Sequence, residues 1–303
     1  MKKSIIILLV LGLLFISVGC EKQKGSNSSI VAEKPHHNST TYKLNYNHDW
    51  LENDLTELGL KDLTIAERVR GCFTAQRPTS SRYVYLFNDY QKYGENSIYH
   101  DSYLVIETDS KILLRDLAND NYSGSYGEEI YVCDVDDDGI DEVVLQQTVG
   151  MTGGAGQYLS RIFKVVGDEI IQLFNSSSIC LYNTGFSCVL KDDYKMEVQN
   201  IFTGYSITLD MIGTKKYSGI YFDEAGKVIS NVYFENIMCD SFMEFIPKDV
   251  DNDGTFEVAC LQYVSLYGHS DGIGYAKSIL KFNKNTKMFE VVGSEFIPMG
   301  AET

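Results

Sequence analysis

Hydrophobic and polar residues alternate with a period of two through most of the chain from Arg82 onward. Such alternation predicts half-buried β-strands, and clusters of Gly, Asn, Asp and Ser between the apolar runs predict turns. The runs are short and rich in β-branched and aromatic residues: RYVYLFN, SYLVIET, KILLRDL, EIYVCDV, DEVVLQQ, YLSRIFKVV, EIIQLF, FSCVL, YKMEVQNI, YSITLDM, GIYFDEAGKVIS and SILKFNKNTKMFEVV. We therefore expect a mainly β protein with many hairpins.

A helical pattern is confined to the region before Arg82. Thr64 and Glu67 match a capping box, which predicts the start of a short helical turn. The residues that share one helical stripe are Trp50, Leu51, Leu55 and Leu58. We predict a short helical segment over residues 44–81, packed on a sheet.

The first twenty residues predict export. Lys2 and Lys3 precede the apolar run Ile5–Val18, which is shorter than the roughly 20 residues of a membrane-spanning helix. The following SVGC resembles the lipobox of bacterial lipoproteins. This resemblance implies a signal peptide over residues 1–19, a lipid on Cys20 and a location on the extracytoplasmic face of the cell membrane. An uncleaved anchor is the alternative.

Charge and composition describe the region after Cys20. Residues 20–43 are polar and lack an apolar period, so we predict a flexible tether. From Cys20 onward, 24 Lys and Arg remain after the loss of Lys2 and Lys3 from the total of 26. Against 42 Asp and Glu, the net charge is 24 − 42 = −18. That charge excludes a nucleic-acid partner, which requires a basic face.

An acidic loop occurs twice in the chain. DVDDDGIDE begins at Asp134 and DVDNDGTFE begins at Asp249. Each is followed by a strand-like run, a stretch that contains several glycines, and a further apolar run. The repeated order of parts predicts two β units, over residues 82–175 and 176–303, with one loop in each.

The spacing D-x-D-x-D-G-x-x-E can turn alternate carboxylates toward one point, and Gly at position 6 permits the sharp turn. Hard oxygen ligands in this number suit Ca²⁺. Two carboxylates about 4.5 Å apart repel by roughly 4 kcal/mol at an effective dielectric of 20, so we expect a cation in each loop. The candidate ligands are Asp134, Asp136, Asp138, the Ile140 carbonyl and Glu142, and Asp249, Asp251, Asp253, the Thr255 carbonyl and Glu257.

An EF-hand needs flanking helices and a Glu at position 12, where Leu145 and Cys260 stand, so that motif is excluded. A loop of this spacing that runs into a strand resembles the calcium loops of FG-GAP or VCBS repeats. The resemblance covers residues 130–165 and 245–282. It implies blade-like β units, as in a complete or an incomplete β-propeller.

Candidate chemistry is sparse. The HExxH and GxxxxGK[ST] patterns do not occur in the sequence. His100 beside Asp101, and the HSD run at residues 269–271, each place a base next to a carboxylate. A ligand surface, if there is one, is expected on aromatic loops. Its candidate residues are Tyr263, Tyr267 and His269 after the second loop, with Met151 and Tyr158 in comparable places after the first.

Six cysteines follow Cys20 without a CxxC motif, and their pairing is left open, with Cys180 and Cys188 as the nearest local pair. We expect a protein that binds or scaffolds at the cell surface, with a protein or glycan partner and without catalytic residues. The alternatives are an envelope hydrolase acting on cell-wall polysaccharide, or a sensor or accessory domain for an envelope partner.

Overall fold

The structure is a computed structural model, and it describes residues 56, 58–60, 63–73, 82–91, 99–108, 112–117, 125, 127–152, 155–177, 184–211, 221–229, 238–266 and 269–300. Fifteen strands and no helical element are found among these residues, which confirms the prediction of a mainly β protein. The predicted signal peptide, the tether and most of the predicted helical stripe lie outside the described residues. Within the described part, no helix is long and apolar enough to cross a membrane.

The strands form four antiparallel sheets, numbered here by their order in the chain. The first sheet contains β1 (Thr64–Gly71), β2 (Arg82–Asp89), β3 (Asp101–Glu107) and β4 (Ile112–Asp116). The second contains β5 (Glu128–Cys133), β6 (Glu142–Thr152), β7 (Ala155–Val166) and β8 (Glu169–Asn175). The third contains β9 (Phe186–Lys191), β10 (Lys195–Asn200) and β11 (Ser206–Asp210). The fourth contains β12 (Met238–Lys248), β13 (Glu257–Ser265), β14 (Gly272–Asn283) and β15 (Met288–Pro298).

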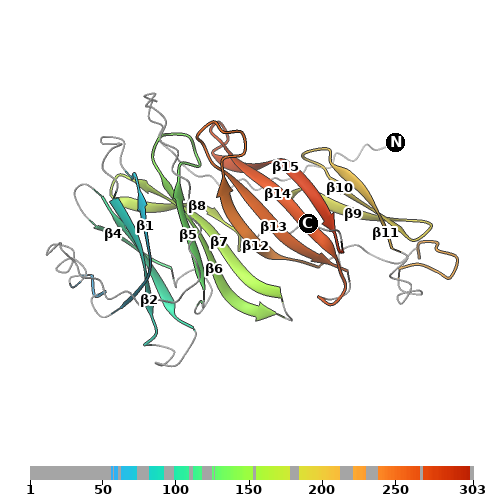
Figure 1. Cartoon of the computed structure of the whole chain (residues 1–303), viewed down its shortest axis with the longest axis horizontal. Coiled ribbons are helices and arrows are strands. Elements are labelled where there is room, and N and C mark those ends of the chain that lie inside the picture. Colours follow the sequence, from blue (N-terminus) through green and yellow to red (C-terminus); the bar gives the residue numbers. More distant parts are fainter. Residues whose placement is uncertain are drawn as a thin grey trace, which may run out of the picture.

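Three hydrophobic cores lie between the sheets and set their order in space. One core joins the first and second sheets, one joins the second and fourth, and one joins the fourth and third. The sheets therefore follow one another as first, second, fourth and third along the long axis of the molecule (Figure 1). The third sheet in sequence thus lies at the far end of the row, beyond the fourth.

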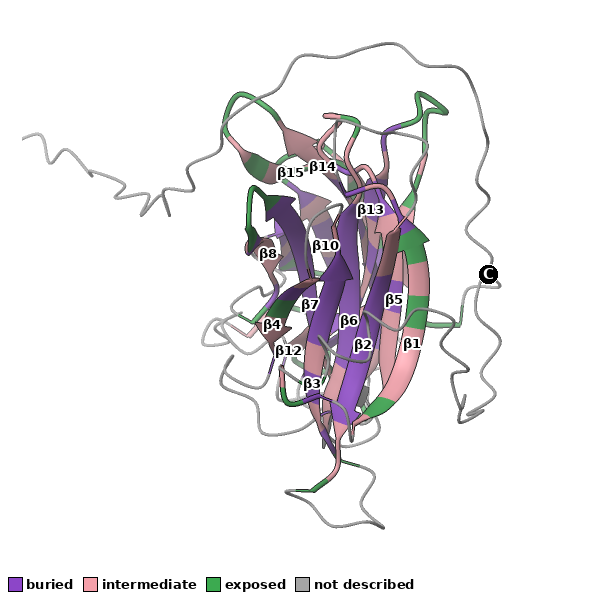
Figure 2. Cartoon of the chain, turned by 90° about the vertical axis from the view of Figure 1, so that its left-hand side faces the viewer, coloured by how far each residue is buried: buried purple, intermediate pink, exposed green. Residues whose placement is uncertain are grey.

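The second sheet is buried on both faces. Val143 and Leu145 of β6 pack toward the first sheet, and Val144 between them packs toward the fourth. All three side chains have 0% exposure, and β6 lies deep within the molecule in Figure 2. A strand covered on both sides has no polar face, which explains why EVVL in β6 is continuously apolar and does not alternate.

The fourth sheet packs with one face. On β13, Val258 and Cys260 contact the second sheet, and Val264 on the same face belongs to the core with the third sheet. Residues on the opposite face of β13, such as Leu261, are only half-buried.

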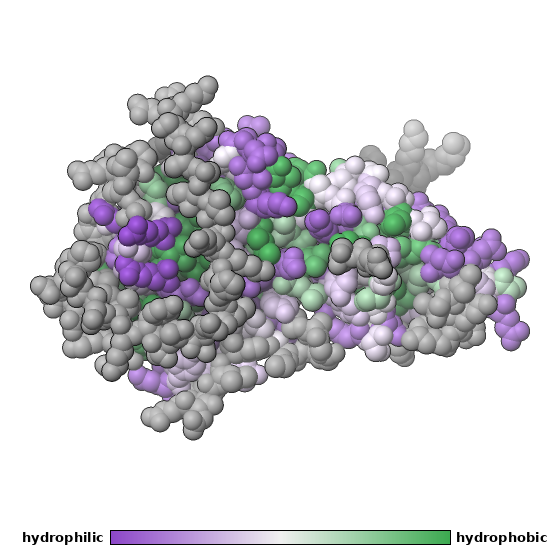
Figure 3. All heavy atoms as spheres, viewed as in Figure 1, coloured by the Kyte–Doolittle hydropathy of each residue, from purple (hydrophilic) through white to green (hydrophobic). Residues whose placement is uncertain are grey.

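On the side seen in Figure 3, hydrophilic residues gather over the third sheet at the right-hand end, and hydrophobic residues form small groups.

The predicted helical turn at Thr64 is wrong, because Thr64–Gly71 is β1, the edge strand of the first sheet. The strand pairs with β2 from Thr64↔Asn88 to Gly71↔Arg82. The capping-box pattern is a local signal whose contribution is small, and pairing with an adjacent strand outweighs it.

Most of the other predicted strands are present, and β12 is a strand that was not predicted. Among the described residues of the hairpin expected at 219–230, a single bridge joins Phe222 to Val228. Each predicted β unit contains more than one sheet. Residues 82–175 hold the second sheet and most of the first, whereas residues 176–303 hold the third and fourth.

Candidate metal centres

The two acidic loops occupy equivalent places. The first loop, Asp134 to Glu142, joins β5 to β6, and the second loop, Asp249 to Glu257, joins β12 to β13. Both adopt the same backbone turn. The φ angle is 57° at both Asp137 and Asn252, and 83° and 89° at the glycines that follow two residues later. Asp, Asn and Gly tolerate this left-handed region, so the composition of the loop is matched to its turn.

Each loop is also held by the same internal hydrogen bonds. The Asp134 carboxylate accepts the backbone N–H groups of Asp138 and Gly139 at 3.2 and 2.8 Å. Glu142 Oε2 accepts the Val135 N–H at 2.9 Å. The second loop repeats these bonds from Asp253, Gly254 and Val250, at 3.1 Å each. The loops are therefore shaped by their own carboxylates.

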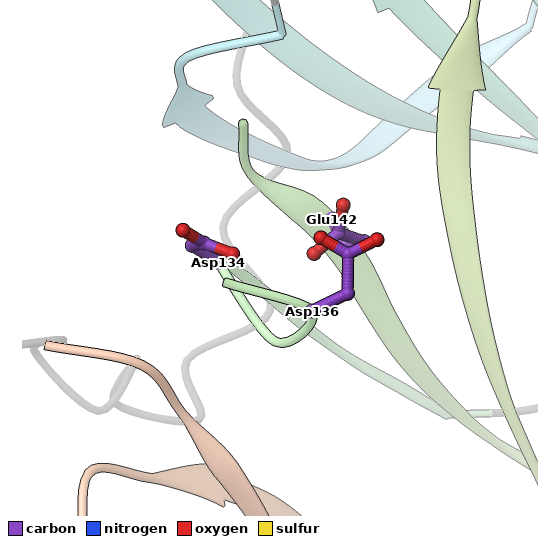
Figure 4. A group of neighbouring side chains, drawn as sticks. All are labelled: Asp134, Asp136 and Glu142. Atoms are coloured by element: carbon purple, nitrogen blue, oxygen red, sulfur yellow. The ribbon is translucent and has the colours of Figure 1, made fainter. Parts of the chain in front are cut away.

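Three of the candidate carboxylates in each loop lie close together. Asp134, Asp136 and Glu142 each place an oxygen within 4.8 Å of the others (Figure 4). Asp249, Asp251 and Glu257 do the same in the second loop. Ile140 and Thr255 were predicted to offer their backbone carbonyls as ligands. Their N–H groups donate to Asp138 and Asp253 at 2.9 and 2.8 Å.

A lysine that sequence analysis overlooked lies inside each cluster. Lys164 Nζ is 2.6 Å from Asp136, 2.8 Å from Asp138 and 2.7 Å from Glu142. Lys281 Nζ is 2.5 Å from Glu257, and it is 3.2 and 3.8 Å from the two aspartates that correspond in the second loop.

These lysines come from the neighbouring strand in both sheets. Val143 pairs with Phe163, and Val258 pairs with Leu280. One position further along the paired strands, Glu142 therefore lies beside Lys164, and Glu257 lies beside Lys281. The sequence signal that could have revealed these lysines is their equivalent place in the two repeats, after Ile-Phe in YLSRIFK and after Ile-Leu in YAKSILK. The divalent cation predicted from the sequence would balance the acidic groups alone, without the charge of these lysines.

Burial separates the two loops. The Lys164 and Asp136 side chains are each 11% exposed, whereas Lys281 is 35% and Asp251 54% exposed. The glutamate is buried in both loops, with Glu142 at 0% and Glu257 at 3% exposure. Glu142 shares its face of β6 with Val144, which packs against the fourth sheet. The corresponding face of the fourth sheet is half-buried. The first loop is thus enclosed between two sheets, and the second is on the outer side of its sheet.

The electrostatics follow the burial. Burial, with the charge of Asp136 and Asp138 in addition, raises the pKa of Asp134 to about 6. Burial likewise raises the pKa of Glu142 well above its usual range, although Lys164 opposes the shift. In the second loop, the hydrogen bond from Lys281 lowers the pKa of Asp251. In the first loop, desolvation is thus the largest cause of the raised pKa values of the carboxylates.

The first loop bonds to the sheets on both sides of it. Asp141 accepts the Cys72 N–H on its carboxylate at 2.6 Å and donates its own N–H to the Cys72 carbonyl at 2.7 Å. On the other side, the Phe256 N–H donates to the Asp134 carbonyl at 2.9 Å. Lys284, in the turn between β14 and β15, reaches the Asp137 carboxylate at 2.6 Å. The loop therefore fixes the second sheet relative to the first and the fourth.

The two loops fit a calcium ion unequally. Ca²⁺ takes six to eight oxygen ligands at about 2.3–2.6 Å. In the first loop, the Lys164 ammonium already contacts three carboxylates that an ion would need, those of Asp136, Asp138 and Glu142. In the second loop, the half-exposed Lys281 can turn toward solvent and leave Asp249, Asp251, Asp253 and Glu257 around a reachable point. The second loop fits the ion, and the first does not while Lys164 stays in place.

The histidine candidates lie elsewhere. His100, with its side chain 4% exposed, pairs with Glu128 at 2.6 Å and not with Asp101. Burial by itself would raise the pKa of Glu128, but the hydrogen bond and the charge of His100, with hydroxyls of Ser125 and Ser102, lower it overall. Because these serines are also buried, the cluster is a packed polar network inside the protein.

The aromatic residues that follow the loops take different positions. The Tyr263 hydroxyl donates to the His269 carbonyl at 2.5 Å and thereby holds the turn after β13. The His269 ring lies 3.4 Å from Asp240. Tyr158 is on β7, where its N–H bonds to Ser241 at 2.8 Å. Tyr267, and the side chain of Met151, lie outside the described part.

Three of the cysteines in the described part are buried thiols. Cys133, Cys188 and Cys260 are buried with free thiols. Burial raises the pKa of Cys188 to about 12 and raises those of Cys133 and Cys260 as well. Such thiols are protonated at neutral pH and behave as small apolar side chains. Cys180 lies outside the described residues.

The fold and the loops define a mainly β protein of stacked antiparallel sheets with two equivalent acidic loops. Residues 184–296 match the family model described as the YybI C-terminal domain. The uncharacterized protein YybI of Bacillus subtilis (strain 168) is 23% identical over 166 residues, which span 54% of this chain and 61% of that protein. The family match begins just before β9 and ends within β15, so it covers the third and fourth sheets with the core between them.

Proposed function

We propose that this chain is the exported, lipid-anchored ectodomain of a cell-surface protein, and that its stacked sheets form a calcium-stabilised scaffold for a protein or glycan partner. The acidic loop carries the proposal: it recurs with the same φ angles and hydrogen bonds at the same place in two sheets. A loop that joins neighbouring sheets is placed to stabilise a scaffold. Ions bound in such loops add to stability by mass action.

We further propose that the four-stranded sheets are blades of an incomplete propeller-like array. Three of the four sheets have the same strand order, each an antiparallel meander. The N–H group at position 8 of each loop, from Asp141 and Phe256, donates to a carbonyl that follows the first strand of the preceding blade, at Cys72 and Asp134. The three-stranded third sheet has no acidic loop, which accounts for the wide spacing of the two loops in sequence.

The histidine candidates give little support to the sequence alternative, an envelope hydrolase. His100 is buried and held by Glu128. His269 is turned toward Asp240, and its backbone carbonyl is bonded to Tyr263. A scaffold role rests on loops that contact several sheets, so we prefer it.

The anchor is tested by changing Cys20. A Cys20→Ala variant should leave the membrane fraction, because an unmodified tether has no acyl chains to bury, each worth about 0.8 kcal/mol per CH₂. Fractionation of cells that express the parent and the variant, with surface crosslinking to reveal a partner, gives the measurement. If the variant stays in the membrane fraction as firmly as the parent, the lipid anchor is ruled out.

Calcium stabilisation is tested by thermal unfolding with Ca²⁺ and with a chelator. At a Ca²⁺ concentration ten times the dissociation constant, one site adds about 1.4 kcal/mol, or roughly 3–6 °C in Tm. We expect this shift in the parent protein and its loss in the Asp251→Asn, Asp253→Asn double variant. Lys277→Met, a change of an exposed side chain on β14, is the control and should keep the full shift. The proposal is contradicted if the Tm of the parent protein is the same with Ca²⁺ and with the chelator.

A further inference from the structure

We infer that Lys164 is a built-in replacement for the divalent cation in the first loop, and that the second loop is the one open to Ca²⁺. The two loops look alike in sequence, but only one would then be a metal site. The second half of this inference rests on the proposed calcium role. The first half stands on the contacts of Lys164 alone.

The ammonium of Lys164 satisfies the loop as an ion would. A lysine has three N–H donors, and here they meet three different carboxylates at 2.6–2.8 Å. A calcium ion would lie about 2.3–2.6 Å from the same oxygens. The two cations would overlap, so binding of one excludes the other.

Displacement of Lys164 is opposed by its surroundings. Its side chain is 11% exposed, and it lies on the face of β7 that packs against the fourth sheet, next to Ile162. A displaced ammonium would remain near low-dielectric surroundings without a carboxylate partner, which is strongly unfavourable. The Phe256 and Lys284 contacts close the loop from the side of the fourth sheet.

Lys281 lacks these restraints. Its side chain is 35% exposed. Its ammonium is 2.5 Å from Glu257, but its contacts to Asp251 and Asp253, at 3.2 and 3.8 Å, are longer than those of Lys164 to Asp136 and Asp138. It can therefore give up its place to a metal ion and be solvated. The difference arises because the first loop lies between two sheets and the second loop lies on the outer side of the fourth sheet.

The test is the number of Ca²⁺ ions bound per chain, measured by equilibrium dialysis of the full-length protein in detergent after chelation. We expect one ion in the parent, none in Asp251→Asn, and still one in Asp136→Asn. We expect two ions in Lys164→Met, because its buried carboxylates, including the unbonded Asp136 Oδ1, then need another cation. The inference is overturned if Asp136→Asn lowers the number bound by the parent, or if Lys164→Met binds no more than the parent.

A thermal measurement covers the case in which Lys164→Met folds poorly. In chelator, its Tm should fall by roughly 6–12 °C, because buried carboxylates lose their partner. Saturating Ca²⁺, added before refolding, should recover most of the loss. The matched Lys281→Met variant should fall by less than about 3 °C. Failure of Ca²⁺ to rescue Lys164→Met contradicts the inference.

The dialysis also separates this inference from the proposed function. If the parent binds no Ca²⁺ and Lys164→Met binds one ion, the calcium role of the second loop fails, but Lys164 still replaces the cation of the first loop. If the parent binds two ions, the calcium role survives and the inference about Lys164 fails.

Discussion

Replacing Arg161 with Met is expected to lower the free energy of unfolding by about 3–5 kcal/mol. Arg161 is fully buried on β7, at 0% exposure. Its guanidinium donates to the Gln147 side chain and, at 3.4 Å, to the Leu117 carbonyl. Met fills much of the volume but donates no hydrogen bond, so two buried acceptors would lose their donor.

The loss should extend beyond these two contacts. Gln147 also bonds to Ser125 at 3.2 Å, and Ser125 donates to Glu128 at 2.5 Å, so Arg161 ends a chain of buried hydrogen bonds that reaches His100. Such networks respond cooperatively to the loss of one member.

Urea denaturation gives the measurement for Arg161→Met, and Arg70→Met serves as the matched control. Arg70 is exposed and bonds to the Tyr83 hydroxyl at 2.6 Å, so its replacement should cost less than about 1 kcal/mol. Equal losses in the two variants would mean that the buried network does not stabilise the fold.

Truncation of Phe245 to Ala is expected to cost about 3–5 kcal/mol. Phe245 is 0% exposed and lies in the core between the second and fourth sheets. Its ring is stacked with Phe174 at 5.2 Å and with Phe242 at 5.7 Å, which joins the sheets that carry the two loops. Removal of the ring leaves a cavity at that junction and loses the stacking.

Phe202→Ala is the matched control for Phe245→Ala. Phe202 is 57% exposed in the turn after β10, so its truncation should cost less than about 1 kcal/mol. Unfolding should be followed by two probes, since a broken junction could release one pair of sheets before the other. A cost below about 1 kcal/mol for Phe245→Ala would show that this core does not hold the sheets together.

Much of the local structure could be predicted from the sequence. Alternation of apolar and polar residues identified most strands after Arg82, because a half-buried strand imposes a period of two. The loop spacing predicted the tight turn and the convergence of Asp134, Asp136 and Glu142, because these features depend on the covalent geometry of nine adjacent residues. The strand β1 escaped prediction because its pairing with β2 outweighs a local capping pattern.

By itself, the sequence determined the class of fold, the tight turn of the two loops and the convergence of three carboxylates in each loop. Only the tertiary structure decided what faces those carboxylates. Lys164 is 22 residues from Glu142 in the sequence, and strand pairing sets its ammonium 2.7 Å from that carboxylate. The packing of the fourth sheet against the second then encloses one loop and leaves the other at the surface. Two loops of similar sequence therefore differ in burial, because burial depends on contacts between distant parts of the chain.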